Sequence, residues 1–205
     1  QVHGVNRPVN REEPLVLCDT ENIGKWMEQA ARFKTPFHVA LPTYGYRVFF
    51  DCTGAFTGIM AEERRQQALG WTHKEIHANP VELARVVKTL ATTRSPYCRG
   101  VAWFRMPVTS DAFNWTWPTL EQVMTGKPPR TTMQTELRFP RENLCELWVQ
   151  NRGDYTPPAI LISVSGPLPG IRALDTVNGF QAQVLSEEER LEFRGPPPGF
   201  GDPVL

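Results

Sequence analysis

The sequence predicts an α/β fold, the C-terminal portion of a TIM-like (β/α)8 barrel, followed by a small all-β sandwich-like module. Two short apolar runs, Phe37–Leu41 and Gly100–Met106, are each closed by a proline, as is typical of buried parallel strands. Helix-type patterns alternate with these runs, and beyond residue 126 the pattern changes to short strand-like runs. A whole barrel takes about 250 residues, so we expect 205 residues to be a fragment of a longer chain.

Composition excludes several classes of protein. The 22 basic and 22 acidic residues balance, so nothing indicates a nucleic-acid partner. No apolar run approaches the length that a membrane-spanning helix needs. The four cysteines lie far apart without a CxxC pair, which argues against a zinc ribbon or a redox centre and leaves open whether they are thiols or disulfides; they are Cys18, Cys52, Cys98 and Cys145.

The first elements in chain order predict a βαβ unit. A strand end over residues 1–5 leads into a polar loop, and Pro14–Cys18 is a short apolar run. Asp19 or Thr20 is then the expected N-cap of a helix with one apolar stripe, which Thr35-Pro36 ends. The buried strand 37–44 follows, so a helix connects two apolar strands.

A β-hairpin is predicted over residues 47–62, where two strand-like runs flank the turn Cys52-Thr53-Gly54. It follows the carboxyl end of the buried strand 37–44, so we expect it to rim a site. Residues 71–77 alternate as a strand does, which places His73, Glu75 and His77 on one face. Three such ligands suit zinc, but the motif His-Glu-x-x-His is absent and a solvated edge strand is the favoured interpretation. We therefore assign no metal site and no cofactor.

Asn79-Pro80 is the clearest helix start in the chain, with asparagine as N-cap and proline at the first helical position. The strand 100–106 comes next, and its alternation puts Val101, Trp103 and Arg105 on one face. We expect that face to point into the barrel mouth, and the apolar face of Ala102, Phe104 and Met106 to pack against helices. A short helix over 118–124 closes the barrel portion, residues 1–126.

Residues 127–205 form the expected β-sandwich-like module, which we also expect to be incomplete. Strand-like runs are separated by turn residues such as Asn151–Asp154 and Asn178-Gly179; the runs cover 135–139, 144–151, 159–165, 180–184 and 190–193.

Candidate binding residues lie at the carboxyl ends of the predicted strands, where α/β sheets place their ligands. An aromatic floor with tyrosine hydroxyls and one guanidinium suits a sugar, whose C–H faces stack on rings and whose hydroxyls need hydrogen-bond partners. The alternative is that Trp103 belongs to the core and Arg105 to a structural ion pair. The candidates are His3, Asn6, Tyr44, Tyr46, Trp103 and Arg105.

No catalytic constellation accompanies these residues. The sequence lacks a glycine-rich phosphate loop and a Gly-x-Ser-x-Gly elbow. Asp111 is the one acid that closely follows a barrel-type strand, and no carboxylate pair suited to glycosidic chemistry is evident.

The stretch Ala40-Leu41-Pro42-Thr43-Tyr44-Gly45-Tyr46, followed by the hairpin and by Gly100-Val101-Ala102-Trp103, resembles the last third of chitinase-like family 18 glycoside hydrolases. The resemblance implies that Tyr44-Gly45 ends the seventh strand and that Trp103 floors the sugar site. The spacing before Trp103 is one residue shorter than in that family. Gln1–Gly4 lacks the family's Tyr-Asp, and its acidic catalytic motif would lie upstream of Gln1.

A more specific resemblance, over most of the chain, is to the uncharacterised bacterial domain-of-unknown-function family 3142. It rests on Leu-Pro-Thr-Tyr-Gly-Tyr-Arg-Val at residues 41–48, on the helix that starts at Asn79, on Gly-Val-Ala-Trp-Phe-Arg at 100–105, on Trp-Pro-Thr-Leu at 117–120 and on a β-rich tail. It implies a fold more than an activity.

Together these patterns lead us to expect a carbohydrate-binding or carbohydrate-active, glycoside-hydrolase-like barrel of the bacterial cell envelope or the extracellular space, with a glycan as its ligand. The alternative is a non-catalytic structural or protein-interaction barrel. If the protein hydrolyses glycans, we expect its catalytic acid to lie upstream of Gln1.

Overall fold

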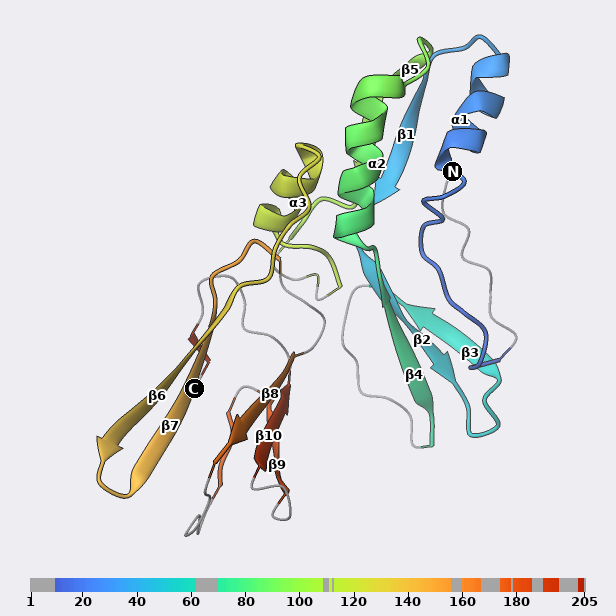
Figure 1. Cartoon of the computed structure of the whole chain (residues 1–205). Coiled ribbons are helices and arrows are strands. Elements are labelled where there is room, and N and C mark those ends of the chain that lie inside the picture. The colour runs from blue at the N-terminus through green and yellow to red at the C-terminus, as the bar shows by residue number, and fades with distance from the viewer. Residues whose placement is uncertain are drawn as a thin grey trace. The chain divides into compact units, whose positions relative to one another are not determined.

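The computed structural model describes most of the chain, and its elements are drawn in Figure 1. The chain folds as two compact units, Gln1–Pro129 and Arg130–Leu205. The described residues are 10–61, 70–108, 111, 113–155, 160–166, 174–177, 179–185, 190–195 and 203–204.

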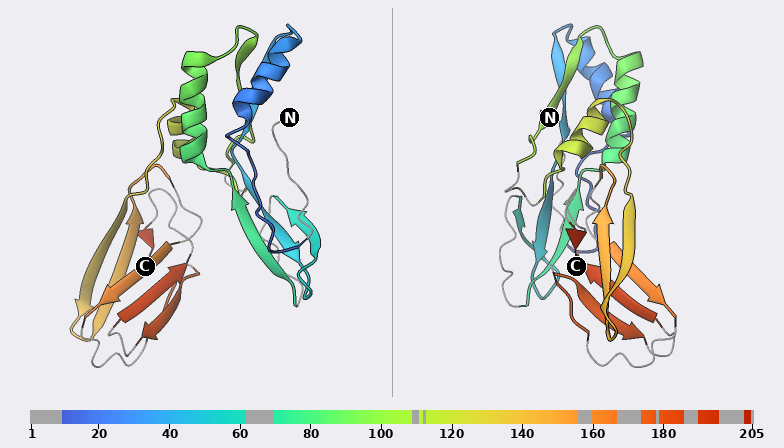
Figure 2. Two further views of the ribbon diagram at one scale, coloured as in Figure 1. Left: turned by 45° about the vertical axis from the view of Figure 1, so that its right-hand side comes forward. Right: turned by 90° about the vertical axis from the view of Figure 1, so that its left-hand side faces the viewer.

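A parallel strand pair is the centre of the first unit. β1 (Phe37–Pro42) pairs with β5 (Cys98–Phe104), with Val39 opposite Val101 and Leu41 opposite Trp103. Helices α1 (Ile23–Arg32) and α2 (Pro80–Thr93) lie on the same side of this pair (Figure 2).

The core of the first unit fills the space between that strand pair and the two helices. Val39 and Leu41 are buried there with Met27 of α1 and Leu83 of α2. Burial of each large apolar side chain contributes about 1.5–3 kcal/mol, so this side of the strand pair holds the helices in place.

A separate antiparallel sheet follows β1 directly. β2 (Gly45–Phe50) pairs with β3 (Phe56–Met60) on one side and with β4 (Thr72–His77) on the other. Tyr46, Val48 and Phe50 alternate along β2 and are buried in the core, whereas Arg47 lies on the opposite face.

The two helix starts differ from each other. At α2 the Asn79 side chain accepts hydrogen bonds from the backbone N–H groups of Val81 and Glu82, which confirms the predicted cap. At α1 the predicted N-cap was wrong, because the helix begins after Asn22. Asp19 instead accepts hydrogen bonds from the backbone and side chain of Asn22, and these bonds lower the pKa of Asp19.

After α3 (Trp117–Met124) the described chain forms two three-stranded antiparallel sheets in the second unit. One sheet has the order β11-β7-β6 and the other β8-β10-β9. Their strands are β6 (Met133–Arg141), β7 (Leu144–Asn151), β8 (Ile160–Ser165), β9 (Gln181–Leu185), β10 (Arg190–Gly195) and β11 (Pro203–Val204).

The predicted TIM-like α/β barrel is wrong. Within the described residues the strands form four separate sheets of two or three strands, none of which closes on itself, and only three short helices accompany them. The physical reason is that β2, β3 and β4 satisfy one another's backbone groups by antiparallel pairing. The parallel pair β1–β5, which the sequence did predict, therefore stays two-stranded in the described part of the chain.

Candidate functional site

Backbone hydrogen bonds fix the chain where β1 and β5 end. The Thr43 N–H donates to the Phe104 carbonyl at 2.8 Å, and the buried Thr43 hydroxyl donates to the Arg105 carbonyl. The Trp115 N–H then donates to the Thr43 carbonyl at 2.8 Å, and the Gly45 N–H to the Phe113 carbonyl at 2.7 Å. Residues 113–115 are thereby held against the end of β1.

Aromatic rings gather at this point. The Tyr44 and Phe104 rings meet edge to face, with centroids 5.7 Å apart and planes at 84°. The Tyr46 ring lies 6.4 Å from that of Tyr44 and is buried in the core. Phe104 is 54% exposed, so its ring meets solvent beside the half-buried Tyr44.

An ion pair completes the site. Arg105 Nη2 lies 2.6 Å from Asp111 Oδ2 and donates to the Ala61 carbonyl at 2.7 Å. The Arg105 Cζ atom is 5.3 Å from the centroid of the Tyr44 ring, within the range of a cation–π contact. The Asp111 side chain is only 5% exposed, so the guanidinium is held between a ring, a carbonyl and a nearly buried carboxylate.

The two tyrosines keep their protons at neutral pH. Burial raises the pKa of Tyr46 to about 12. Burial also raises the pKa of Tyr44, although the charge of Arg105 offsets part of that effect. The Tyr44 hydroxyl is therefore neutral at pH 7, a form that can both donate and accept hydrogen bonds.

The structure gathers some of the predicted site residues and separates others. Tyr44 and Arg105 are in contact, and Tyr46 lies behind Tyr44. Trp103 instead packs, with Val101, against the core of the first unit. His3 and Asn6 lie outside the described residues.

The predicted faces of β5 are reversed. The alternation itself is as expected, but Val101 and Trp103 face the core, whereas Ala102, Phe104 and Met106 are exposed. Sequence reasoning therefore missed Phe104, because it assigned that ring to helix packing. No signal in the alternation distinguishes the two faces, since both carry apolar residues.

Asp111 was singled out as the acid that follows a strand, but its role was not predicted. Its Oδ1 accepts from the Phe113 N–H at 3.1 Å while its Oδ2 meets Arg105. The ion pair that was the alternative interpretation of Arg105 is thus present, and it lies at the strand ends.

A second polar cluster covers the outer face of β2 and β4. Arg47 and Glu75 are directly opposite and form an ion pair, and Glu75 Oε2 lies 3.7 Å from His77 Nε2. The Arg47 guanidinium also lies 5.6 Å from the centroid of the Phe113 ring. The pKa of His73 is lowered, chiefly because burial disfavours the charged form of its ring. In the described ranges no group of three or more His, Cys, Asp or Glu residues is arranged to hold a metal ion.

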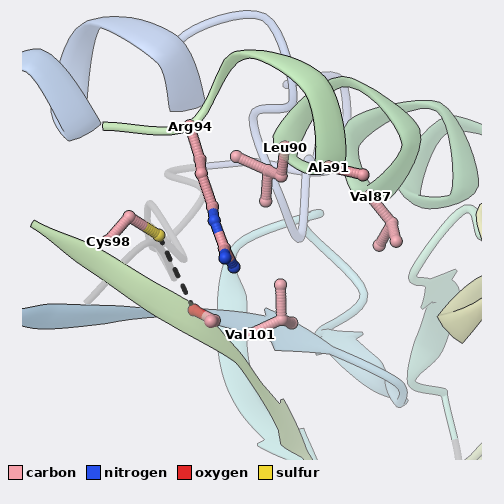
Figure 3. A pocket seen from close by; sticks show the side chains of 7 residues that line it. Val87, Leu90, Ala91, Arg94, Cys98 and Val101 are labelled. Carbon is pink, nitrogen blue, oxygen red and sulfur yellow. Dashed lines mark hydrogen bonds between the residues drawn. The ribbon is translucent and has the colours of Figure 1, made fainter. Parts of the chain in front are cut away.

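A small apolar hollow lies between α2 and β5 (Figure 3). Its volume is about 170 Å³, and Val87, Leu90 and Val101 line it beside Arg94. Ligand pockets usually enclose about 300–1,000 Å³ and present several convergent polar groups. A second hollow, of about 130 Å³, lies between residues 15–20 and the start of α2. Neither hollow matches the polar and aromatic character of the strand-end site.

All four cysteines are free thiols, which resolves the question that their spacing left open. Cys98 is buried, Cys18 is half-buried, and Cys52 and Cys145 are exposed. Burial is the main cause that raises the pKa of the Cys18 thiol to about 11, so it is a poor nucleophile at neutral pH.

Comparison with known proteins gives one match. A family model described as "Domain of unknown function (DUF3142)" matches residues 1–109, which is more than half of the chain. No curated protein and no solved structure matches. Among the described helices none has the length and apolarity to cross a bilayer.

Proposed function

We propose a function from the site itself, since the chain belongs to the family described as a domain of unknown function (DUF3142), whose name assigns no activity. The proposal is that the protein binds carbohydrate where β1 and β5 end. The observation that carries it is the exposed Phe104 ring beside Tyr44 and the Arg105–Asp111 ion pair.

The chemistry of these groups matches a sugar ring. A pyranose presents C–H groups on its faces and hydroxyls around its edge, so it binds where an exposed ring adjoins fixed donors and acceptors. Phe104 offers the ring, and the half-buried Tyr44 adds a neutral hydroxyl group to the same part of the site. Arg105, whose side chain is 22% exposed, adds a charged donor group, and charged groups make the stronger hydrogen bonds.

The ion pair favours a neutral glycan. Arg105 and Asp111 lie 2.6 Å apart, so their charges largely cancel at the distance of a ligand. A sulfated or uronic acid sugar would meet the Asp111 carboxylate as well as the guanidinium. We therefore expect neutral chitin oligosaccharides to bind better than acidic glycans, such as peptidoglycan fragments with free carboxylates.

The proposal is limited to binding. Glycoside hydrolysis usually needs one carboxyl group that donates a proton and a second carboxylate. Asp111 instead pairs with Arg105 and accepts a hydrogen bond from the Phe113 N–H.

The test is a glycan array followed by calorimetric titration of the glycans that bind. Phe104→Ala removes the stacking surface, and we expect its Kd to rise by about tenfold, the effect of about 1.4 kcal/mol. The matched control is Phe139→Ala in the second unit, because that ring is 71% exposed and lies in a different sheet. The control should bind as the wild type does.

Two results would overturn the proposal. One is that no neutral glycan binds at up to about 1 mM, a Kd that corresponds to a binding free energy of about −4.1 kcal/mol. The other is that Phe104→Ala and Phe139→Ala have the same affinity as the wild type.

Protein binding is the second candidate function, and one observation favours it. Met106 and Val108 are each at least half exposed, so exposed apolar side chains continue along the chain after Phe104. A contiguous exposed apolar patch often marks a protein-binding surface. The variant Met106→Ser separates the two functions, because it should leave glycan affinity unchanged and weaken only the binding of a protein.

A further inference from the structure

β6 is an edge strand with an unusual degree of exposure. Every residue from 134 to 141 is exposed, so neither face of this stretch is covered by the described residues. β7 pairs with one edge of β6, and among the described strands none pairs with the other. β11 reaches only Gln150 and Val149 of β7, so beyond these positions β6 and β7 form a two-stranded ribbon.

A two-stranded ribbon in water is only marginally stable, and an open edge is a template for pairing with another chain. Natural edge strands often carry like charges, above all lysines, that repel a second edge. Proline and bulges protect edges too, and β6 has both, but only toward its end, at Pro140 and after Arg138. Its central residues Glu136 and Arg138 instead have opposite charges and lie on the same face. The other face carries Leu137, which is 49% exposed, and Phe139.

We propose that β6 pairs with β6 of a second copy of this chain, antiparallel about a two-fold axis at Leu137. In this register Leu137 faces Leu137 of the partner subunit, and Glu136 faces Arg138 of the partner subunit. Two such ion pairs form, one on each side of the axis. Two separate ribbons thereby become one continuous four-stranded sheet.

The charge pattern selects this register over its neighbours. A two-fold axis at residue 136 would place two glutamates directly opposite each other. An axis at residue 138 would place two arginines directly opposite each other. Like charges directly opposite destabilise an antiparallel pair, whereas opposite charges stabilise it. The bulge in the pairing of β6 with β7 begins after Arg138, so the three central pairs of the proposed interface use regular strand.

Contacts within one chain place Glu136 and Arg138 together on one face of the ribbon. The Arg138 Cζ atom lies 3.9 Å from the centroid of the Trp148 ring on β7, and Arg138 Nη2 lies 2.8 Å from Glu136 Oε2. Trp148 is fixed in turn, because its indole N–H donates to Glu146 at 3.0 Å. Since Trp148 belongs to β7, the guanidinium leans away from the open edge, and the proposed pairing requires it to turn toward Glu136 of the partner subunit.

Sedimentation equilibrium of the full chain, from about 1 µM to about 1 mM, tests the proposal. We expect a reversible dimer whose Kd rises by at least about tenfold in Leu137→Lys, because two lysines then meet on the axis. Leu161→Lys is the matched control, since Leu161 of β8 is 50% exposed and lies outside the proposed interface. The control should dimerise as the wild type does.

A charge exchange identifies the register. Glu136→Lys and Arg138→Glu each place like charges opposite each other in a homodimer, so each variant alone should associate at least about tenfold more weakly. An equimolar mixture should recover the association, because the two variant strands are complementary. The proposal is overturned if the wild type is a monomer throughout the range, if Leu161→Lys weakens the dimer as much as Leu137→Lys, or if the mixture associates no better than its components.

Discussion

Arg105 is the residue on which the candidate site depends. It contacts a ring, a backbone carbonyl and a carboxylate that come from three different parts of the chain, Tyr44, Ala61 and Asp111. The same side chain therefore has a structural role and a proposed binding role. The structural role of Arg105 can be measured without any ligand, as a change in the free energy of unfolding when the residue is replaced.

Replacement of Arg105 by alanine should destabilise the first unit. It leaves the nearly buried Asp111 carboxylate without its cation, which typically costs about 3–5 kcal/mol. The exposed pair of Arg138 and Glu136 provides the comparison, because Arg138→Ala should lower the free energy of unfolding far less than Arg105→Ala does. Urea denaturation of both variants gives the two values. Equal losses would contradict the burial of the Asp111 charge.

Tyr46 should make stability depend on pH in the alkaline range. Its pKa is about 12 in the folded protein and about 10 when the chain is unfolded. A raised pKa means that the contribution of Tyr46 is complete below pH 10 and is lost as the pH rises from about 10 to about 12. In Tyr46→Phe this part of the alkaline loss should disappear, as followed by the free energy of unfolding at several pH values. An unchanged alkaline profile in the variant would show that Tyr46 ionises as an exposed tyrosine does.

At the scale of elements, the features that could be predicted are those that depend only on residues adjacent in the sequence. The start of α2 at Asn79-Pro80 could be predicted because a cap needs only a side-chain acceptor and the adjacent N–H groups. The face of β5 that meets the core could not be predicted, because it depends on the side of the strand pair on which the helices pack. Val101 and Trp103 on one side, and Ala102 and Phe104 on the other, are all apolar enough to be buried.

Gly45 marks the junction between β1 and β2, and it should not tolerate a side chain. A Cβ atom at Gly45 would lie 2.7 Å from His77 Nδ1 and nearer still to the Ile76 carbonyl oxygen, a backbone atom that cannot move aside. We expect Gly45→Ala to lower the free energy of unfolding by about 1–3 kcal/mol, the cost typical of overpacking. Gly58→Ala on β3 is the matched control, since its Cβ would meet no atom within 4 Å. Thermal unfolding of both variants checks the difference, and equal stability would contradict the close approach of β4 to Gly45.

At the scale of the whole molecule, the order of helices and strands was easier to predict than their assembly. Two apolar runs closed by prolines indicated buried parallel strands, and β1 and β5 do form a parallel pair. The predicted βαβ unit was wrong, because residues 14–18 form no strand. The extension of that pair to a barrel failed, because β2 and β4 pair with each other instead of extending the parallel sheet. Sequence periodicity reports which residues of a strand share a face, but it does not report which strands are neighbours.

The candidate site shows the same limit. Tyr44 and Arg105 could be placed at strand ends from the sequence. Asp111 joins them only through the path of the chain after β5, and Phe104 joins them because the helices pack on the opposite face of β5. That path is fixed by long-range hydrogen bonds, such as the one from the Trp115 N–H to the Thr43 carbonyl. Interactions of this kind leave no periodic signal in the sequence.

Amide chemical shifts, recorded while a neutral glycan that binds in the array is titrated into the labelled full chain, test the proposed function most directly. We expect the largest saturable changes at Tyr44, at residues 104–106 and at Asp111, and we expect them to need about tenfold more glycan in Phe104→Ala. Saturable changes confined to residues 130–205, or identical changes in wild type and Phe104→Ala, would contradict carbohydrate binding at the ends of β1 and β5.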